Sequence, residues 1–243
     1  MSETRRPPRP ERLHPGGFAS KRLAAADIIE MLGWRKAVRE VAPWLLERKY
    51  LFFWYDLRHI AAARPAGAPI SLERAGESNL SDIMALRPGY YTRELLEKRL
   101  ARGHAGFLGR SRGRPVFSRW VFLDRVYLPY LGRTLSLPQG DCFTDETYVA
   151  PPFRGQGIFS GSVFSFQTAL REMGMVRTFS AVASWNEAPL KDAPRAGGIP
   201  FGGCRIIRRF GGRMVSWKGE IRDAGDGTIS FLAPPDQPGF STT

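Results

Sequence analysis

The chain has 243 residues, of which 43% are hydrophobic, and this is enough to fill the core of one large domain. Its 36 lysines and arginines outnumber its 23 acidic residues, and the net charge of +13 favours an anionic partner. No apolar run approaches the ~20 residues of a membrane span. The first residues, MSETRRPPRPERLHPGG, lack the apolar segment of a secretory signal. We therefore expect a cytoplasmic protein, while the charge leaves peripheral association with a membrane surface open.

Cysteine content and motifs narrow the function classes further. Cys142 and Cys204 are far apart and belong to no cluster with metal-ligand spacing, so we expect neither a metal site nor a disulfide. Nucleic-acid binding is not favoured, because no nucleic-acid motif accompanies the basic charge.

The chain divides into four predicted regions. Residues 1–18 are rich in proline and arginine and lack hydrophobic periodicity, which predicts a disordered basic arm. Residues 19–48 carry apolar residues at helical spacing and predict a helical extension. The main domain is predicted over 49–222, and 223–243 is predicted to be a C-terminal tail.

Strands and helices are mixed within the main domain, which predicts an α/β (α+β) fold. Thr92 is a candidate N-cap for one of the helices, and Gly103 is a stop signal for it. The predicted elements, in chain order, are strands at 49–57 and 70–75, a helix at 92–103, a hairpin at 105–124, a strand at 145–150, a helix at 159–173, a strand at 177–186, a short helical segment, and a hairpin at 203–219.

The sequence VAPPFRGQGIFSG, at 149–161, joins a predicted strand to a predicted helix. Gly155 and Gly157 carry no side chains, so their amides can approach a phosphate at the positive end of the helix. Arg154 adds a formal charge. We interpret this loop as a phosphate or pyrophosphate site at 154–159. The alternative interpretation is a plain strand-to-helix turn with an exposed arginine.

This loop resembles the acyl-CoA signature of the GNAT superfamily of CoA-dependent N-acyltransferases, in which V-x-P at a strand end is followed by R-G-x-G-I. Asn186 at the end of the next strand and Gly197 eleven residues later resemble the second segment of the family. The phenylalanine after R-G-x-G-I resembles a variant from bacterial biosynthetic clusters. The resemblance is specific over about 145–200 and weaker over 70–144, and it does not cover 1–48.

The resemblance implies a mostly antiparallel sheet that is flanked by helices and splayed at the acyl-CoA site, between strands 145–149 and 178–184. It implies that the pantetheine arm pairs with backbone in this gap and that the glycine loop holds the pyrophosphate. The implied cofactor-binding residues are Tyr148, Val149, Arg154, Gly155, Gln156, Gly157, Ile158, Phe159 and Asn186.

The implied activity is acyl transfer from acetyl-CoA or a longer acyl-CoA to an amine on a peptide or metabolite, by direct displacement and without a metal. Two positions depart from the family: Ala193 stands where many members have a general-acid tyrosine, and Gly198 replaces an aromatic residue. We expect these departures to widen the acceptor side. Two alternatives stay open: a protein that senses acyl-CoA without turnover, and one that binds nucleic acid or anionic lipid.

Acyl transfer to an amine needs a base that removes the ammonium proton. Glu146 is the first candidate and Asp145 the second, because both immediately precede the glycine loop. In a regular strand these two side chains would point to opposite faces of the sheet. Each of them also fits a solvated charge at a strand edge.

Overall fold

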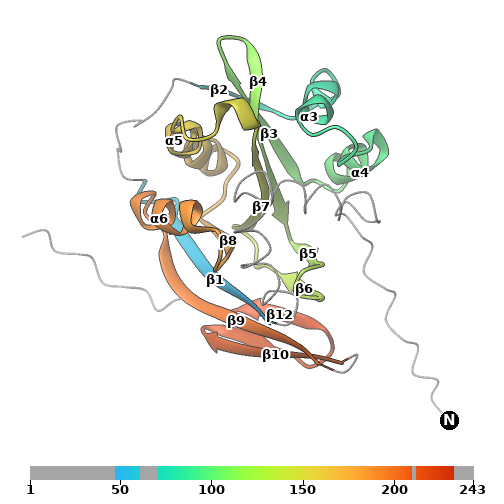
Figure 1. The fold of residues 1–243 in the computed structure, drawn as a ribbon, viewed down its shortest axis with the longest axis vertical. Coiled ribbons are helices and arrows are strands. Elements are labelled where there is room, and N and C mark those ends of the chain that lie inside the picture. Colours follow the sequence, from blue (N-terminus) through green and yellow to red (C-terminus); the bar gives the residue numbers. More distant parts are fainter. Residues whose placement is uncertain (1–46, 61–69, 210–211, 233–243) are drawn as a thin grey trace, which may run out of the picture.

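The computed structural model describes residues 47–60, 70–209 and 212–232 (Figure 1). The predicted arm at 1–18 lies outside the described residues, and so does the predicted helical extension except for its last two residues. These two, Glu47 and Arg48, begin the first strand of the sheet.

An eight-stranded sheet forms the centre of the molecule. Its strands follow the order β10-β9-β1-β8-β7-β4-β3-β2, and every neighbouring pair is antiparallel except β7 and β8, which are parallel. The strands are β1 (Glu47–Asp56), β2 (Ser71–Arg74), β3 (Ala105–Ser111), β4 (Arg114–Leu123), β7 (Asp141–Val149), β8 (Arg177–Ala183), β9 (Ile199–Arg209) and β10 (Gly212–Gly219). The predicted mixed α/β fold with a mostly antiparallel sheet is thus confirmed.

Helices cover both faces of this sheet (Figure 1). The helices are α3 (Leu80–Leu86), α4 (Arg93–Ala101), α5 (Ile158–Glu172) and α6 (Glu187–Arg195), and a short 3-10 turn (Pro151–Phe153) precedes α5. α3 and α4 pack on one face, in the cluster that contains Trp120 and Phe122. α5 packs on the opposite face, where Phe166 contacts Phe107 in the cluster that contains Val121. Side chains alternate along β4, so consecutive residues of this strand pack into the cores on opposite faces of the sheet.

Local sequence signals explain several boundaries. The Thr92 hydroxyl accepts a hydrogen bond of 3.2 Å from the Leu95 amide, and this caps α4 as predicted. Arg112 and Gly113 connect β3 to β4 with positive φ angles of 50° and 77°, as a two-residue hairpin turn requires.

A second, four-stranded sheet was not predicted. Its strands are β5 (Arg125–Leu128), β6 (Arg133–Ser136), β11 (Ile221–Asp223) and β12 (Thr228–Phe231), in the order β11-β12-β6-β5. The predicted tail boundary is corrected here, because β12 lies within 223–243 but belongs to the core. Its Phe231 ring lies 4.9 Å from Phe179 and 5.5 Å from Phe52, measured between ring centroids.

We predict that Phe231→Ala lowers the free energy of unfolding by about 3–5 kcal/mol, because a buried aromatic side chain is replaced by a cavity. The matched control is Leu232→Ala, since Leu232 is the next residue and is 43% exposed. The control should cost less than about 1 kcal/mol. Urea unfolding of both variants checks this, and equal small losses would show that this segment does not contribute to the core.

Candidate functional site

The ladder between β7 and β8 is short, although both strands continue beyond it. It pairs Asp141–Thr144 with Arg177–Ser180, while β7 runs on to Val149 and β8 to Ala183. The Asp141 carboxylate anchors the start of the ladder, accepting two hydrogen bonds of 2.8 Å from the Arg177 guanidinium. Beyond Thr144 the two strands separate, and this opens a gap in the sheet. Their outer edges remain paired, β7 with β4 and β8 with β1.

A β-bulge in β7 begins where this ladder ends. Ser118 pairs with Tyr148 and Trp120 pairs with Asp145, so two residues of β7 oppose one residue of β4. Glu146, the first of the two, has a φ of +52°, a left-handed conformation that is rare outside glycine. The bulge bends the strand and increases its local twist, which turns β7 away from β8.

The bulge is held by a buried ion pair. The Glu146 carboxylate accepts hydrogen bonds of 2.9 and 2.8 Å from Nη1 and Nη2 of Arg99, which α4 supplies. The two side chains are 5% and 0% exposed. Burial by itself lowers the pKa of Arg99, but the adjacent Glu146 carboxylate outweighs this, so the pKa of Arg99 lies above its ordinary value.

The bulge also corrects the expectation that the two candidate bases point to opposite faces. Asp145 pairs directly with Trp120 of β4, whose side chain packs on the α3 and α4 face, so Asp145 lies on the same face as Glu146. Tyr50 and Tyr130 pack on this face too, and the pKa values of both are raised. Burial is the larger cause of both shifts, and it brings the pKa of Tyr50 to about 12. The rings of these two tyrosines lie 4.8 Å apart. Asp145 therefore lies on the face that carries these aromatic residues, and its Oδ1 accepts a hydrogen bond of 2.8 Å from the Glu146 amide, whereas the Glu146 carboxylate is paired with Arg99.

The glycine loop leads directly into α5. Gly155 and Gly157 have φ angles of 75° and 70°, and Gly157 is the N-cap of the helix. No side chain caps this end, and the first turn holds no acidic residue. A Cβ added at Gly155 would have no atom within 4 Å, so this part of the loop faces open space. The predicted strand, glycine loop and helix are thus present, with the positive end of a 15-residue helix at the loop.

Two side chains tie the loop to its surroundings. The Nε of Arg154 donates a hydrogen bond of 3.1 Å to the Val149 carbonyl, and the side-chain amide of Gln156 donates one of 2.8 Å to the Pro152 carbonyl. Arg154 thus connects the loop to the end of β7 in addition to bringing its charge.

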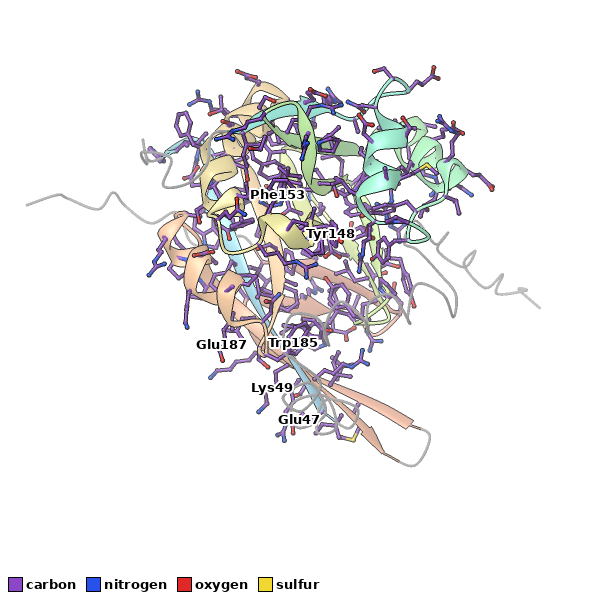
Figure 2. All side chains as sticks on the ribbon, turned by 45° about the horizontal axis from the view of Figure 1, so that its top comes forward. Glu47, Lys49, Tyr148, Phe153, Trp185 and Glu187 are labelled. Atoms are coloured by element: carbon purple, nitrogen blue, oxygen red, sulfur yellow. The ribbon has the colours of Figure 1, made fainter. Side chains whose placement is uncertain are left out.

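Asn186 lies at the other side of the gap, where β8 gives way to α6. It is the N-cap residue of α6, but its side chain makes no capping hydrogen bond. Figure 2 labels Tyr148 and Phe153, near the loop that leads to α5, and Trp185 and Glu187, where the chain enters α6. The structure thus brings the predicted cofactor residues to the two strand ends that border the gap.

The expected widening at Ala193 and Gly198 is wrong, because Tyr55 of β1 fills this space. Ala193 is buried against Tyr55, and a Cβ added at Gly198 would lie only 2.8 Å from the Cε1 atom of this tyrosine. Sequence reasoning missed Tyr55, since nothing in the aromatic run at 49–57 distinguishes it from the core residues beside it.

Sequence reasoning also missed Arg99. The only signal is its position three residues after Leu96, which places both residues on the same face of α4. A charged residue on a buried helix face needs a partner, and this could have pointed to Glu146.

Several other features do not add to the site. An open groove of about 720 Å³ lies between β2, β3 and α5, lined by residues such as Leu72 and Phe164, and it includes none of the predicted site residues. Among the described residues, no group of three or more His, Cys, Asp or Glu side chains could hold a metal ion. In the same part of the chain, no helix has the length and apolar character needed to cross a membrane.

Comparison with known proteins gives similarity at the level of solved structures. No protein-family model and no curated protein sequence matches the chain. A GCN5-related N-acetyltransferase from Sphaerobacter thermophilus aligns at 14% identity over 75% of this chain and 56% of that chain, with a TM-score of 0.47. A conserved protein of unknown function from Staphylococcus epidermidis aligns at 11% identity over 75% of this chain and 66% of that chain, with a TM-score of 0.44. This chain thus spans less than two thirds of the length of either protein.

An aminoglycoside 6′-N-acetyltransferase from Acinetobacter baumannii aligns at 18% identity over 61% of this chain and 97% of that chain, with a TM-score of 0.39. All three TM-scores are below 0.5, so the function proposed below rests on the geometry of this chain.

We predict that Arg99→Met lowers the free energy of unfolding by about 3–5 kcal/mol, because it leaves the Glu146 carboxylate buried without its partner. Adding Glu146→Leu should recover part of the loss, since it removes that carboxylate and keeps an unbranched Cβ at the strained position. The matched control is Arg93→Met on the same helix, which removes a half-exposed pair with Glu97 and should cost less than about 1 kcal/mol. If chemical unfolding shows equal losses for the two arginine variants, the pair does not hold the bulge.

Proposed function

We propose that this protein is an acyl-CoA-dependent N-acyltransferase, which transfers an acetyl or longer acyl group to an amine on a peptide or metabolite. One observation carries the proposal: the β7–β8 ladder ends at Thr144, and the gap it leaves opens beside an uncapped, glycine-led helix N-terminus. An extended pantetheine arm can pair with a strand edge in the way that a peptide adds to a sheet. A pyrophosphate fits at the positive end of α5.

All of the predicted cofactor residues except Arg154 have a specific role in this proposal, and Arg154 adds its positive charge to the loop. The amides of Gly155, Gly157 and Ile158 bind the pyrophosphate, because two of these residues have no side chain and the third opens the helix. Tyr148 and Val149 present the β7 edge to the pantetheine, and the Asn186 side chain contacts it from the β8 side. Gln156 shapes the loop, and Phe159 packs beneath it with Ile158.

Acyl transfer then proceeds by direct displacement. The amine nitrogen attacks the thioester carbonyl carbon, the C–N bond forms, the C–S bond breaks, and the thiolate leaves and takes up a proton. We assign the base to Asp145, in preference to Glu146, because Glu146 is held by Arg99. Tyr50 and Tyr130 pack on the same face of the sheet as Asp145, and burial raises their pKa values, so they stay neutral at physiological pH and offer aromatic rings to an ammonium group.

A covalent acyl-cysteine route is not supported. Both cysteines are buried, and burial raises the pKa of the Cys142 thiol to about 12. Because the thiolate is the reactive form, such a thiol is a poor nucleophile at neutral pH. Direct displacement needs no such intermediate.

We predict that acetyl-CoA raises the melting temperature of the protein and that Gly157→Ala abolishes the shift, because a Cβ there blocks the approach of the phosphate. A ligand at about 100 times its Kd adds roughly 2.7 kcal/mol of stability. The control is Gly174→Ala, because Gly174 follows the other end of α5 with a φ of +83° and pays the same backbone strain. No shift with any CoA species in the unmodified protein would overturn the proposal.

Asp145→Asn should lower kcat by about 10²–10⁴-fold, because the base is lost, and should leave the affinity for acetyl-CoA unchanged. Release of free thiol with a panel of amines measures the rate. Glu172→Gln, an exposed change at the far end of α5, should keep full activity.

Tight acyl-CoA binding with no thiol release for any amine would indicate a sensor. If the protein binds no CoA, but binds nucleic acid or anionic vesicles and keeps this binding in Gly157→Ala, it is a nucleic-acid-binding or lipid-binding protein.

A further inference from the structure

Arg119 of β4 is a buried, positively charged side chain next to the gap. Among the described residues, it has no carboxylate as a counter-ion. The residue is 7% exposed, and its Nη2 donates a hydrogen bond of 2.8 Å to the Thr144 hydroxyl. Its guanidinium carbon lies 4.2 Å from the centroid of the Phe166 ring and 5.5 Å from that of Phe159. The Nε atom is buried and has no hydrogen-bond partner. Within the described ranges, no carboxylate lies at ion-pairing distance from this guanidinium.

The two buried arginines of this site differ in a way that points to a ligand. Arg99 meets the Glu146 carboxylate on the α4 face of the sheet, and its pKa is raised. On the α5 face, burial lowers the pKa of Arg119 to about 10, and the weaker effects of Tyr55, Cys142 and Asp145 do not offset this. A buried charge normally has a partner, because its desolvation is otherwise uncompensated. An anion that enters with a ligand would supply the missing partner.

The position of Arg119 identifies the part of the ligand that would reach it. Thr144, its hydrogen-bond partner, is the last β7 residue in the ladder with β8, so Arg119 lies where the gap begins. Phe159 belongs to the first turn of α5, next to the proposed pyrophosphate site. A CoA thioester that starts at this helix and runs into the gap would therefore bring its acyl end towards Arg119.

We infer that Arg119 selects an acyl-CoA whose acyl chain ends in a carboxylate, such as a succinyl group, and this inference rests on the proposed acyltransferase function. Carboxylate is the preferred partner of a guanidinium, which donates from two nitrogens at once. With Nη2 directed at Thr144, the unpaired Nε can donate to the incoming carboxylate. The aromatic rings of Phe159 and Phe166 hold the guanidinium in place and exclude water.

The test compares succinyl-CoA with butyryl-CoA, a neutral thioester of the same chain length, by calorimetric titration of the full-length protein. We expect succinyl-CoA to bind at least about ten-fold more tightly, which corresponds to about 1.4 kcal/mol. In Arg119→Met the two affinities should become equal through a loss for succinyl-CoA alone, and Arg119→Lys should keep part of the preference. Because Arg119 has no counter-ion in the folded protein, Arg119→Met should unfold no more easily than the unmodified protein.

Equal binding of the two thioesters by the unmodified protein would overturn the inference and leave the proposed acyltransferase intact. A succinyl preference that persists in a folded Arg119→Met protein would also overturn it. If neither thioester binds, both the inference and the proposed function fail. The comparison within the unmodified protein decides the question even if a variant does not fold.

Discussion

The ion pair between Arg99 and Glu146 determines where the central sheet opens. Glu146 adopts a left-handed backbone conformation at the bulge, and the buried guanidinium compensates its carboxylate. Such a conformation carries strain, which persists because the surrounding contacts fix it. The bulge turns β7 away from β8 after only four paired residues, although the Asp141–Arg177 pair holds the other end of this ladder together. A regular β7 strand would continue the ladder with β8, and the gap would close.

The gap has two different sides, and the sheet separates them. On the α5 side are a helix N-terminus without an acidic residue and the buried cation of Arg119, so this side suits an anionic ligand. On the α3 and α4 side are Asp145, Tyr50 and Tyr130, so this side suits a cationic amine. The reacting atoms would meet between these sides. This charge distribution supports the proposed acyl transfer from a CoA thioester to an amine.

The sequence predicted those features of the fold that depend on the conformational preferences of a few neighbouring residues. The Thr92 cap, the Arg112–Gly113 turn and the glycine loop were predictable, because each depends on the conformational preferences of a few neighbouring residues. The strands of the second sheet, which are three or four residues long, were not, since so short a run shows no clear periodicity. The bulge at Glu146 and its partner Arg99 are 47 residues apart, and only the tertiary fold brings them together. The filling of the space beside Ala193 by Tyr55 is a long-range contact of the same kind.

We propose that an acyl-CoA occupies the gap between β7 and β8 and contacts the N-terminus of α5. Amide hydrogen exchange of the full-length protein, with and without acetyl-CoA, tests it at the level of segments. We expect slower exchange at 145–149 and 155–160, because the ligand would cover these amides, and unchanged exchange in the β9–β10 hairpin. Protection confined to a different surface, or none at saturating acetyl-CoA, would show that acetyl-CoA does not bind in this gap.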